Sequence, residues 1–418
     1  MQIRKLRQQL MTKKIGAREL AKSYLERIEK NKDLNAYSYI SEDVLNEADK
    51  AQEKINKGEI SLLTGIPISI KDNINVANMP TTHGSNLFIK RNANKDAAAV
   101  SNLKQLGAVI LGKTNMDELA MGGDGTSSFF GPSLNPHDKL RTPGGSSSGA
   151  AVSVAADLCA CAVGTDTGGS ITQPSSFCGL TGFKPSNNLV NPSGLLMLVP
   201  EMDVIGPLAK SAEDCMEMLT CMSGLVFPYP QDGIENLKGV NIAVIEQFLV
   251  GDVVKPIEEV LNFFKDRGAI INYVSFQEAT EDVYSHYAYS ICAKFIEEHF
   301  KGYEDLLGKE AIRRLNLGKE FINNGAFKES INKKEILAKK ASEILSKNMF
   351  VVGPATSSVA PKFGENIPNI CTDWINLSHL PNVSTPMKVS SLPLGLSITS
   401  YPNMDGRILA LANLIEQC

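Results

Sequence analysis

Short, largely apolar runs are the feature of this sequence that most restricts how the chain can fold. Three of them cover residues 66–70, 108–111 and 160–163, and each ends at polar or small residues. Apolar runs of this length are typical of strands that are buried on both faces of a sheet. Such strands need helices packed against them, so the sequence predicts an α/β layered fold.

Segments with helical periodicity alternate with these runs. Leu20, Tyr24 and Ile28 follow one another at intervals of four residues, which places them on one face of a helix. Helices are predicted over 17–31, 42–57, 98–106 and 255–267, with one more ending near 156; further strands are predicted at 240–245, 270–274 and 350–352. Residues 281–302, 308–324 and 330–347 form a helical stretch. We predict one domain over 1–418, with 281–347 as a helical cap or insertion within it.

One phosphate-loop pattern is present but lies in the wrong context. Gly107 and Gly112 are separated by Ala-Val-Ile-Leu and followed by Lys-Thr. A phosphate loop needs a flexible turn between its glycines, so that backbone N–H groups can surround the phosphate. Here the four intervening residues read as a strand, and Gly107 reads as a helix C-cap. We therefore predict no nucleotide site at this position.

Charge and cysteine usage exclude other classes of protein. The net charge is −4 and the basic residues are dispersed, whereas a nucleic-acid-binding face clusters Lys and Arg. The eight cysteines are scattered through apolar surroundings. Cys159 and Cys161 lie in an apolar run, with no His or Cys pair at ligand spacing, so we expect buried reduced thiols and no metal site.

The N-terminal residues lack the apolar region of a signal peptide, and no run of about twenty apolar residues occurs. We therefore expect a cytoplasmic protein with no membrane contact.

Three segments carry residues suited to chemistry: Ile68-Ser-Ile-Lys71-Asp-Asn-Ile, Pro143-Gly-Gly-Ser146-Ser-Ser-Gly and Gly164-Thr-Asp-Thr-Gly-Gly-Ser170-Ile. Taken singly, each has an ordinary reading as a solvated strand end, a turn or a helix N-cap. Thr172 stands where the serine elbow of α/β-hydrolases needs its last glycine. Because no histidine lies near either serine loop, a Ser-His-Asp triad has little support.

Taken together, the three segments resemble the amidase signature family. Residues 144–185 carry the resemblance most densely, with Ser146 and Ser170 24 residues apart. The resemblance implies the family's fold, a large central mixed β-sheet covered by helices on both faces. It also implies a Ser–cis-Ser–Lys triad with Ser170 as nucleophile, Ser146 as bridging serine and Lys71 as base. The peptide bond before Ser146 would be cis.

The residue types suit that chemistry. A serine hydroxyl is a weak nucleophile and needs a neighbouring base, and lysine can serve only if its surroundings lower its pKa. The resemblance implies an oxyanion hole made by the backbone N–H groups of Thr167, Gly168 and Gly169, together with that of Ser170. Glycines there let the backbone approach a substrate carbonyl closely.

Within the family, the chain is similar to the A subunits of the glutamyl-tRNA(Gln) and aspartyl-tRNA(Asn) amidotransferases. Segments 112–122, 130–137 and 310–318 carry this similarity. It implies glutamine hydrolysis that supplies ammonia to a B subunit, with a small C subunit holding the pair together and tRNA bound mainly by the partner. This chain would need no cofactor, while ATP and Mg²⁺ would belong to the partner.

The same similarity implies a set of substrate-binding residues: Gly122, Ser147, Arg314 and Asn369. Arg313 is the alternative to Arg314. Asn369 stands where the family has an acidic residue for the substrate's α-amino group, and Asp373 is the alternative. Two other readings stay open from the sequence: a stand-alone amidase that acts on another small amide, and a non-catalytic scaffold subunit descended from an amidase.

Overall fold

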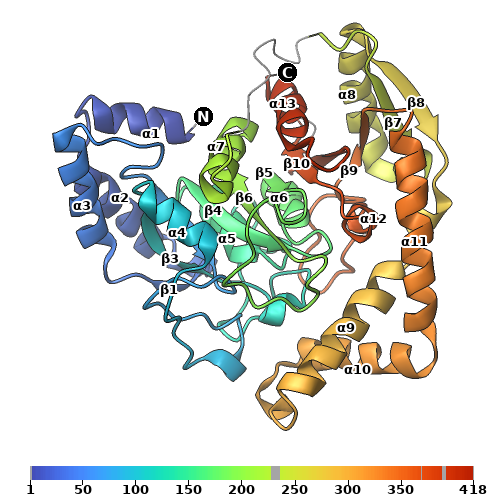
Figure 1. Ribbon diagram of the computed structural model, residues 1–418, viewed down its shortest axis with the longest axis horizontal. Coiled ribbons are helices and arrows are strands. Elements are labelled where there is room, and N and C mark those ends of the chain that lie inside the picture. Colours follow the sequence, from blue (N-terminus) through green and yellow to red (C-terminus); the bar gives the residue numbers. More distant parts are fainter. Residues whose placement is uncertain (1, 227–235, 369, 388–391, 418) are drawn as a thin grey trace.

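The computed structural model describes residues 2–226, 236–368, 370–387 and 392–417, and within these ranges eleven strands form one sheet (Figure 1). The strands are β1 Tyr37–Ile40, β2 Pro67–Lys71, β3 Val109–Thr114, β4 Cys161–Asp166, β5 Thr181–Lys184, β6 Val204–Ala209, β7 Asn241–Ile245, β8 Ile270–Val274, β9 Phe350–Pro354, β10 Asn382–Pro386 and β11 Gly395–Thr399. Their order is β1-β3-β2-β4-β6-β5-β10-β11-β9-β7-β8.

Parallel and antiparallel pairs occur together in this sheet. The neighbours β3, β2 and β4 are parallel, as are β9, β7 and β8. All other neighbouring pairs, from β1–β3 to β11–β9, are antiparallel. The predicted α/β fold with a mixed central sheet is therefore confirmed.

Helices surround the sheet. They are α1 Gln2–Met11, α2 Ala17–Lys30, α3 Val44–Lys57, α4 Ala98–Gln105, α5 Ser148–Ala155, α6 Thr172–Cys178, α7 Ala212–Ser223, α8 Val254–Asp266, α9 Val283–His299, α10 Lys309–Asn323, α11 Ala326–Leu345, α12 Asp373–Leu377 and α13 Asp405–Glu416. None of these described helices is long and apolar enough to cross a lipid bilayer.

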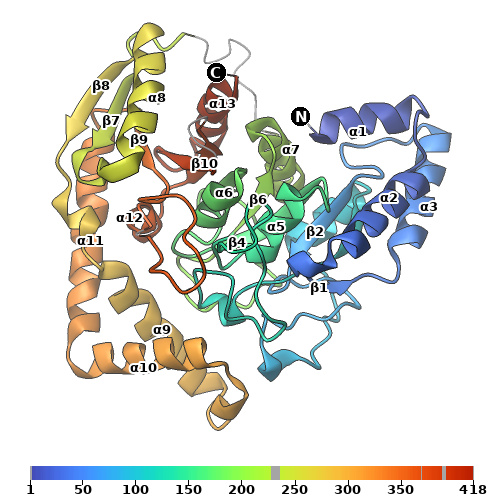
Figure 2. The same ribbon diagram turned by 180° about the vertical axis from the view of Figure 1, so that it is seen from behind.

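Two neighbouring residues of β5 show that helices lie on opposite faces of the sheet. Thr181 bonds through its hydroxyl to Glu416 of α13. At Gly182 the space for a side chain is filled by Ser175 of α6. Because successive strand residues point to opposite faces, α6 and α13 cover different sides. Accordingly, α13 and α7 lie toward the viewer in Figure 1, and α5 and α6 do so in Figure 2.

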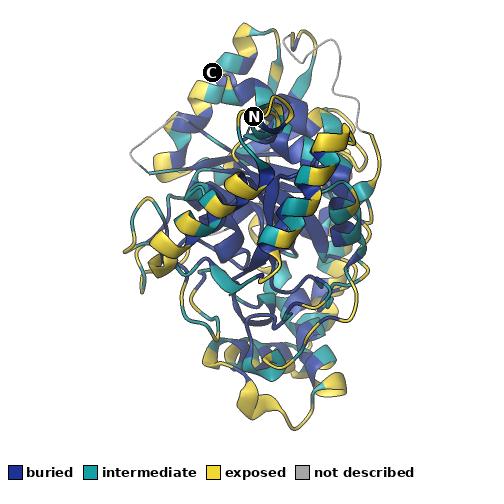
Figure 3. Ribbon diagram, turned by 90° about the vertical axis from the view of Figure 1, so that its left-hand side faces the viewer, coloured by how far each residue is buried: buried dark blue, intermediate teal, exposed yellow. Residues whose placement is uncertain are grey.

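Amphipathic helices form the outer layer near the N-terminus. Leu20, Tyr24 and Ile28 of α2 are buried, as their spacing predicted. Figure 3 shows α1 to α3 with yellow exposed faces turned outward over the dark blue interior. Each of the predicted helices and strands is present, with ends that shift by a few residues.

Helices α9, α10 and α11 pack on one another at one end of the molecule (Figure 1). Their apolar residues belong to a second hydrophobic cluster, separate from the main core around β2 to β4. This cluster includes Phe276, Trp374 and Leu315. Treating residues 1–418 as one domain with 281–347 as its cap stays a prediction.

Candidate active site

Lys71 stands at the end of β2, between the parallel strands β3 and β4. Its side chain is fully buried. Nζ lies 2.8 Å from Ser146 Oγ, 2.9 Å from Ser147 Oγ and 2.8 Å from Thr165 Oγ1. The carboxyl ends of parallel strands meet at one edge of a sheet, so the same edge presents Lys71 and the turn that follows β4.

Burial lowers the pKa of Lys71 to about 7, although the carboxylates of Asp166, Asp117 and Asp203 favour the charged form. Removing an ammonium group from water costs more than these charges return. A large fraction of Lys71 is therefore a neutral amine at neutral pH, and a neutral amine can accept a proton from Ser146.

The loop that carries Ser146 is held between α5 and buried polar groups. The Gly145–Ser146 peptide bond is cis, as the family resemblance implied. Gly145 donates its N–H to Gln173 Oε1 at 3.1 Å, and a Cβ at Gly145 would lie only 2.0 Å from Asp117 Oδ2. Any side chain at this position would have to displace the Asp117 carboxylate. Helix α5 packs on β2 to β4, which places the loop directly over Lys71.

Asp166 shapes the turn that carries Ser170. Its Oδ1 accepts the Gly169 N–H at 2.8 Å, and its Oδ2 accepts the Ile171 N–H at 2.6 Å. Asn376 of α12 donates to the same carboxylate at 2.6 Å. These hydrogen bonds to the carboxylate fix the turn around Ser170, a residue that is 9% exposed. Within the described residues the Ser170 hydroxyl has no hydrogen-bond partner.

The two glycines of this turn are needed for different reasons. Gly169 has φ of +103°, a conformation that other residues rarely adopt. A Cβ at Gly168 would lie 2.2 Å from the ring of Tyr284 in α9. Because the Gly169 N–H already donates to Asp166, the N–H groups that remain for a substrate oxygen are those of Thr167, Gly168 and Ser170.

A cavity opens beside this turn, toward α9 and α10. It is lined by Asn73, His83, Leu119, Ala120, Met121, Thr165, Thr167, Leu195, Leu196, Leu198, Val199, Asp203, Tyr284, Ala288, Tyr289, Cys292 and Arg314. Lys71, Ser146 and Ser170 do not themselves line it, but Thr165 contacts Lys71 and Thr167 begins the Ser170 turn. The cavity therefore adjoins the proposed triad.

The predicted substrate-binding residues fall in different places. Arg314 lines the cavity, with Nε 2.7 Å from Glu310 and its guanidinium 5.1 Å from the centre of the Tyr289 ring. Arg313 is 55% exposed and pairs with Glu310 outside the cavity, so Arg314 is the better placed of the two arginines. Asn369 lies outside the described residues.

Gly122 packs on Asp117, next to Met121, which lines the cavity. Ser147 is turned toward Lys71 and donates to the Thr165 carbonyl at 3.0 Å. Asp373 lines a separate groove with Glu281 and Asp282, and burial raises its pKa to about 7. The substrate-binding roles of Gly122 and Ser147 stay predictions.

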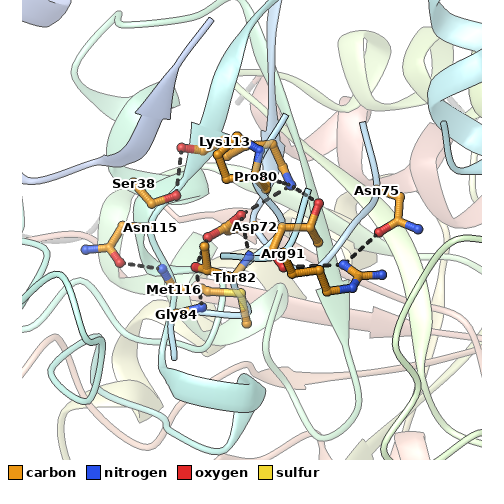
Figure 4. A network of polar contacts seen from close by, with 11 residues as sticks. Ser38, Asp72, Asn75, Pro80, Thr82, Gly84, Arg91, Lys113, Asn115 and Met116 are labelled. Atoms are coloured by element: carbon orange, nitrogen blue, oxygen red, sulfur yellow. Dashed lines mark hydrogen bonds and ion pairs between the residues drawn. The ribbon is translucent and has the colours of Figure 1, made fainter. Parts of the chain in front are cut away.

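A buried ion pair supports the segment after Lys71 (Figure 4). Lys113 Nζ lies 3.2 Å from Asp72 Oδ1, and both side chains are almost fully buried. Lys113 also donates to the Pro80 carbonyl, while Asp72 accepts the Thr82 N–H at 3.2 Å. The lysine of the apparent phosphate loop thus ties β3 to the chain beside β2. The strand predicted at 108–111 is the first half of β3, Val109–Thr114, and Gly107 follows the C-cap residue of α4 with positive φ.

Several residues of this site were not predicted from the sequence. Asp166 could have been found, because an acidic residue before a Gly-Gly turn is suited to accept backbone N–H groups. Asn73, His83 and Asp203 carry no such local signal. They meet Tyr284 and Tyr289 only through the tertiary fold.

Thr167 donates its hydroxyl to Asp203 Oδ1 at 2.5 Å. The other carboxylate oxygen of Asp203 accepts the N–H groups of Leu198 and Val199. Burial raises the pKa of Asp203 to about 6, so the group is mostly ionised at pH 7. The cavity thus holds one carboxylate, from Asp203, and one guanidinium, from Arg314.

Comparison with known proteins places the chain in a family. The family model described as Amidase matches residues 19–409. The A subunit of the glutamyl-tRNA(Gln) amidotransferase from Thermoanaerobacter pseudethanolicus is 34% identical over 99% of this chain and 96% of its own length. Its counterpart from Legionella pneumophila is 32% identical, covering 98% of this chain and 95% of the relative.

Solved structures of amidases and of an amidotransferase A subunit also resemble this chain. A crystal structure of an amidase has a TM-score of 0.90 and 28% identity, covering all of this chain and 99% of the other. The A subunit of the glutamyl-tRNA(Gln) amidotransferase from Thermotoga maritima has a TM-score of 0.78 and 26% identity. The match covers 96% of this chain and 91% of the other. With a family model that matches most of its length and relatives this similar, the chain belongs to the amidase family of hydrolases.

Proposed function

We propose that this chain hydrolyses a carboxamide through Ser170, with Ser146 and Lys71 as the proton relay. The observation that carries the proposal is the buried amine of Lys71, 2.8 Å from Ser146 Oγ and with a pKa lowered to about 7. A neutral amine in contact with a serine hydroxyl is a base poised for proton transfer at physiological pH.

In the proposed reaction the Ser170 oxygen attacks the amide carbon. Its proton passes to Ser146, and the proton of Ser146 passes to Lys71. The negative oxygen of the tetrahedral intermediate accepts hydrogen bonds from the N–H groups of Thr167, Gly168 and Ser170. As the intermediate collapses, the C–N bond breaks, and the relay returns the proton from Lys71 through Ser146 to the leaving nitrogen, which departs as ammonia. Water then cleaves the acyl-enzyme ester, giving the free acid and restoring Ser170.

We further propose that the amide is glutamine and that its ammonia feeds a partner. Sequence identity of 34% to the A chain of an amidotransferase, over nearly the whole of both proteins, supports this assignment. In that assembly a B subunit would use ATP and Mg²⁺ to activate Glu-tRNA(Gln) or Asp-tRNA(Asn) and would bind most of the tRNA. A C subunit would hold the two together. A cytoplasmic location fits this role and stays a prediction.

A second candidate function is a stand-alone amidase. A structure described as an amidase has a TM-score of 0.90, whereas the Thermotoga maritima amidotransferase chain has 0.78. A peptide amidase from Stenotrophomonas maltophilia has 0.85 at 25% identity. These likenesses to amidases are the support for the second candidate.

A glutaminase assay with and without B and C subunits separates the two candidates. Glutamine turnover that rises when the subunits are added supports the amidotransferase. Efficient hydrolysis of unrelated amides by the chain alone, with no glutamine turnover in any complex, supports the stand-alone enzyme.

A fluorophosphonate probe tests the nucleophile and the scaffold reading together. Wild-type protein should be labelled at Ser170, and Ser170→Ala should not be labelled. Ser148→Ala is the matched control: it lies in the Ser146 loop region, but its hydroxyl is directed at Ser133, 3.4 Å away, so labelling should persist. A folded wild-type protein that reacts with no such probe and hydrolyses no amide would be a scaffold.

A further inference from the structure

Two buried polar atoms without partners meet at the cavity beside the Ser170 turn. Asn73 Oδ1 and His83 Nε2 have no hydrogen bond within the described part of the chain, and both residues line that cavity. Asn73 is 4% exposed and His83 2%. A buried polar atom left without a partner carries an uncompensated desolvation cost. A bound molecule that supplies hydrogen-bond partners would remove this cost.

Both side chains are held in place by their neighbours. Asn73 donates through Nδ2 to Thr165 Oγ1 at 3.0 Å, so its free atom is the oxygen, which can only accept. His83 packs edge-on against Phe88, with ring centres 5.0 Å apart. The backbone N–H of His83 donates to the backbone carbonyl of Asp72, the residue just before Asn73. The side chains of Asn73 and His83 therefore start from two backbone segments that lie next to each other.

The segment that carries His83 is fixed by the buried pair of Asp72 and Lys113. Asp72 accepts the Thr82 N–H, and Lys113 donates to the Pro80 carbonyl (Figure 4). Lys113 also donates to the Thr81 hydroxyl. Burial, together with the positive charges of Arg91 and Lys113, lowers the pKa of His83 well below its usual value. The imidazole is neutral, so one ring nitrogen lacks a proton and can accept a hydrogen bond.

The charges in the same cavity are arranged for a molecule with both an amine and an acid. Asn73 and neutral His83 offer acceptors, and Asp203 adds a carboxylate. A protonated amine has three N–H donors and needs such acceptors. Arg314 lines the same cavity and presents the planar donor set that binds carboxylates.

We infer that Asn73 and His83 bind the amino group of an α-amino acid amide whose carboxylate is held by Arg314. This inference rests on the proposed amide hydrolysis and names the class of substrate. A site built from polar groups rejects an analogue that lacks the matching group, because its own buried atoms are then left unpaired. Asn73 and His83 would therefore set specificity rather than carry out the chemistry.

The test compares glutamine with its deamino analogue 4-carbamoylbutanoate, which keeps the carboxamide and the carboxylate but has no amine. The value of kcat/KM is measured for both substrates in the full chain, with whichever subunits give glutamine turnover. The measured quantity is the selectivity, the ratio of the two kcat/KM values. Any effect that a substitution has on Lys71 through Thr165 acts on both substrates and cancels in the ratio.

Wild-type protein should prefer glutamine. His83→Phe, which keeps an aromatic ring against Phe88, and Asn73→Ala should each reduce the selectivity roughly ten- to hundredfold, the range for a hydrogen bond to a charged group. Asn75→Ala is the control. It lies two residues from Asn73 but binds Arg91 and does not line the cavity, so its selectivity should equal that of the wild type.

Two outcomes would overturn the inference. If the wild-type protein hydrolyses glutamine and the deamino analogue with nearly equal kcat/KM, the inference is overturned, even if neither variant folds. If both variants fold and keep the wild-type selectivity, the inference is also overturned, whereas the proposed amide hydrolysis is not affected. If the wild-type chain hydrolyses neither substrate under any condition, the proposed glutamine hydrolysis and this inference both fall.

Discussion

At the scale of single residues, the protonation of Lys71 makes the proposed reaction depend on pH. Only the neutral amine accepts a proton, and burial lowers its pKa from 10.5 to about 7. We expect kcat/KM to rise with pH through an apparent pKa near 7 and then to level off. Lys71→Arg should stay inactive, because arginine keeps its charge. A wild-type profile that still climbs at pH 10 would contradict the role of Lys71 as base.

The same group links pH to stability. An unfolded chain keeps a proton on Lys71 until about pH 10.4, whereas the folded chain releases it near pH 7. Between these values the unfolded state binds more protons, so the contribution of this group to stability rises with pH. Urea denaturation of wild type and Lys71→Met at pH 6 and pH 9 should show a smaller pH-dependent gain in the variant.

Ser146 and Lys71 should act as one unit. Ser170→Ala, Ser146→Ala and Lys71→Ala should each lower kcat by a factor on the order of 10⁴ or more, and the double variant Ser146→Ala/Lys71→Ala should be little worse than the worse single one. Steady-state kinetics on folded variants, checked by circular dichroism, measures this. Losses that multiply in the double variant would show that the two residues act independently.

At the scale of secondary-structure elements, the ion pair of Lys113 and Asp72 ties β3 to the segment after β2. Lys113→Met would leave a buried carboxylate unpaired, which costs about 3–5 kcal/mol. Lys104→Met is the matched control, since its pair with Asp96 is partly exposed and should matter by less than about 1 kcal/mol. The free energy of unfolding of the wild type and of both variants is measured by urea titration. Equal losses in the two variants would contradict the structural role of Lys113.

The contact of α9 with the Ser170 turn gives another prediction. A Cβ at Gly168 would collide with the Tyr284 ring, so Gly168→Ala must displace the turn. Because the Gly168 N–H is a proposed oxyanion donor, kcat should fall by a factor of about 100 to 1,000. Gly168→Ala/Tyr284→Ala should recover part of this loss in kcat. A double variant as slow as Gly168→Ala would mean that the collision is not the cause.

The elements show how far the sequence could predict the fold. Helices with a clear apolar face, such as α2, and short apolar strands, such as β7, were predicted nearly to their ends, whereas β4 runs three residues past the predicted 160–163. Strand β5 (Thr181–Lys184), with one apolar residue in four, was not, because its burial comes from α6 and strands distant in sequence. Helix α7 was missed although Ser211 caps it and acidic residues follow, a signal that could have been read.

The site was predictable to the extent that its residues belong to local motifs. The loops around Ser146 and Ser170 and the lysine at the end of a strand are short patterns, and the structure brings Lys71 and Ser146 together. Asn73 and His83 are joined to Arg314 only by the packing of α9 and α10 on the sheet. The spacing of residues along the sequence cannot predict a contact that depends on how distant elements pack.

At the scale of the whole molecule, burial of the thiols leads to a further prediction. The seven cysteines within the described ranges are buried. A thiol reagent should therefore react slowly with these seven cysteines in the native protein, and it should react readily with all eight after denaturation. Reducing agent should leave the melting temperature unchanged. Fewer than eight reactive thiols in denaturant, restored by a reductant, would indicate a disulfide.

The position of β10 and β11 in the sheet has a consequence for how the protein is made. These two strands, nearly the last in the chain, stand between β5 and β9 and join the sheet's two parts. A chain still emerging from the ribosome therefore holds Lys71, Ser146 and Ser170 on one part and α9 and α10 beside the other. Within the described strands, β10 and β11 complete the link between the two parts of the sheet. We therefore expect a chain that ends before β10 to hold the cavity wall less firmly against the serine turn and to have little hydrolase activity.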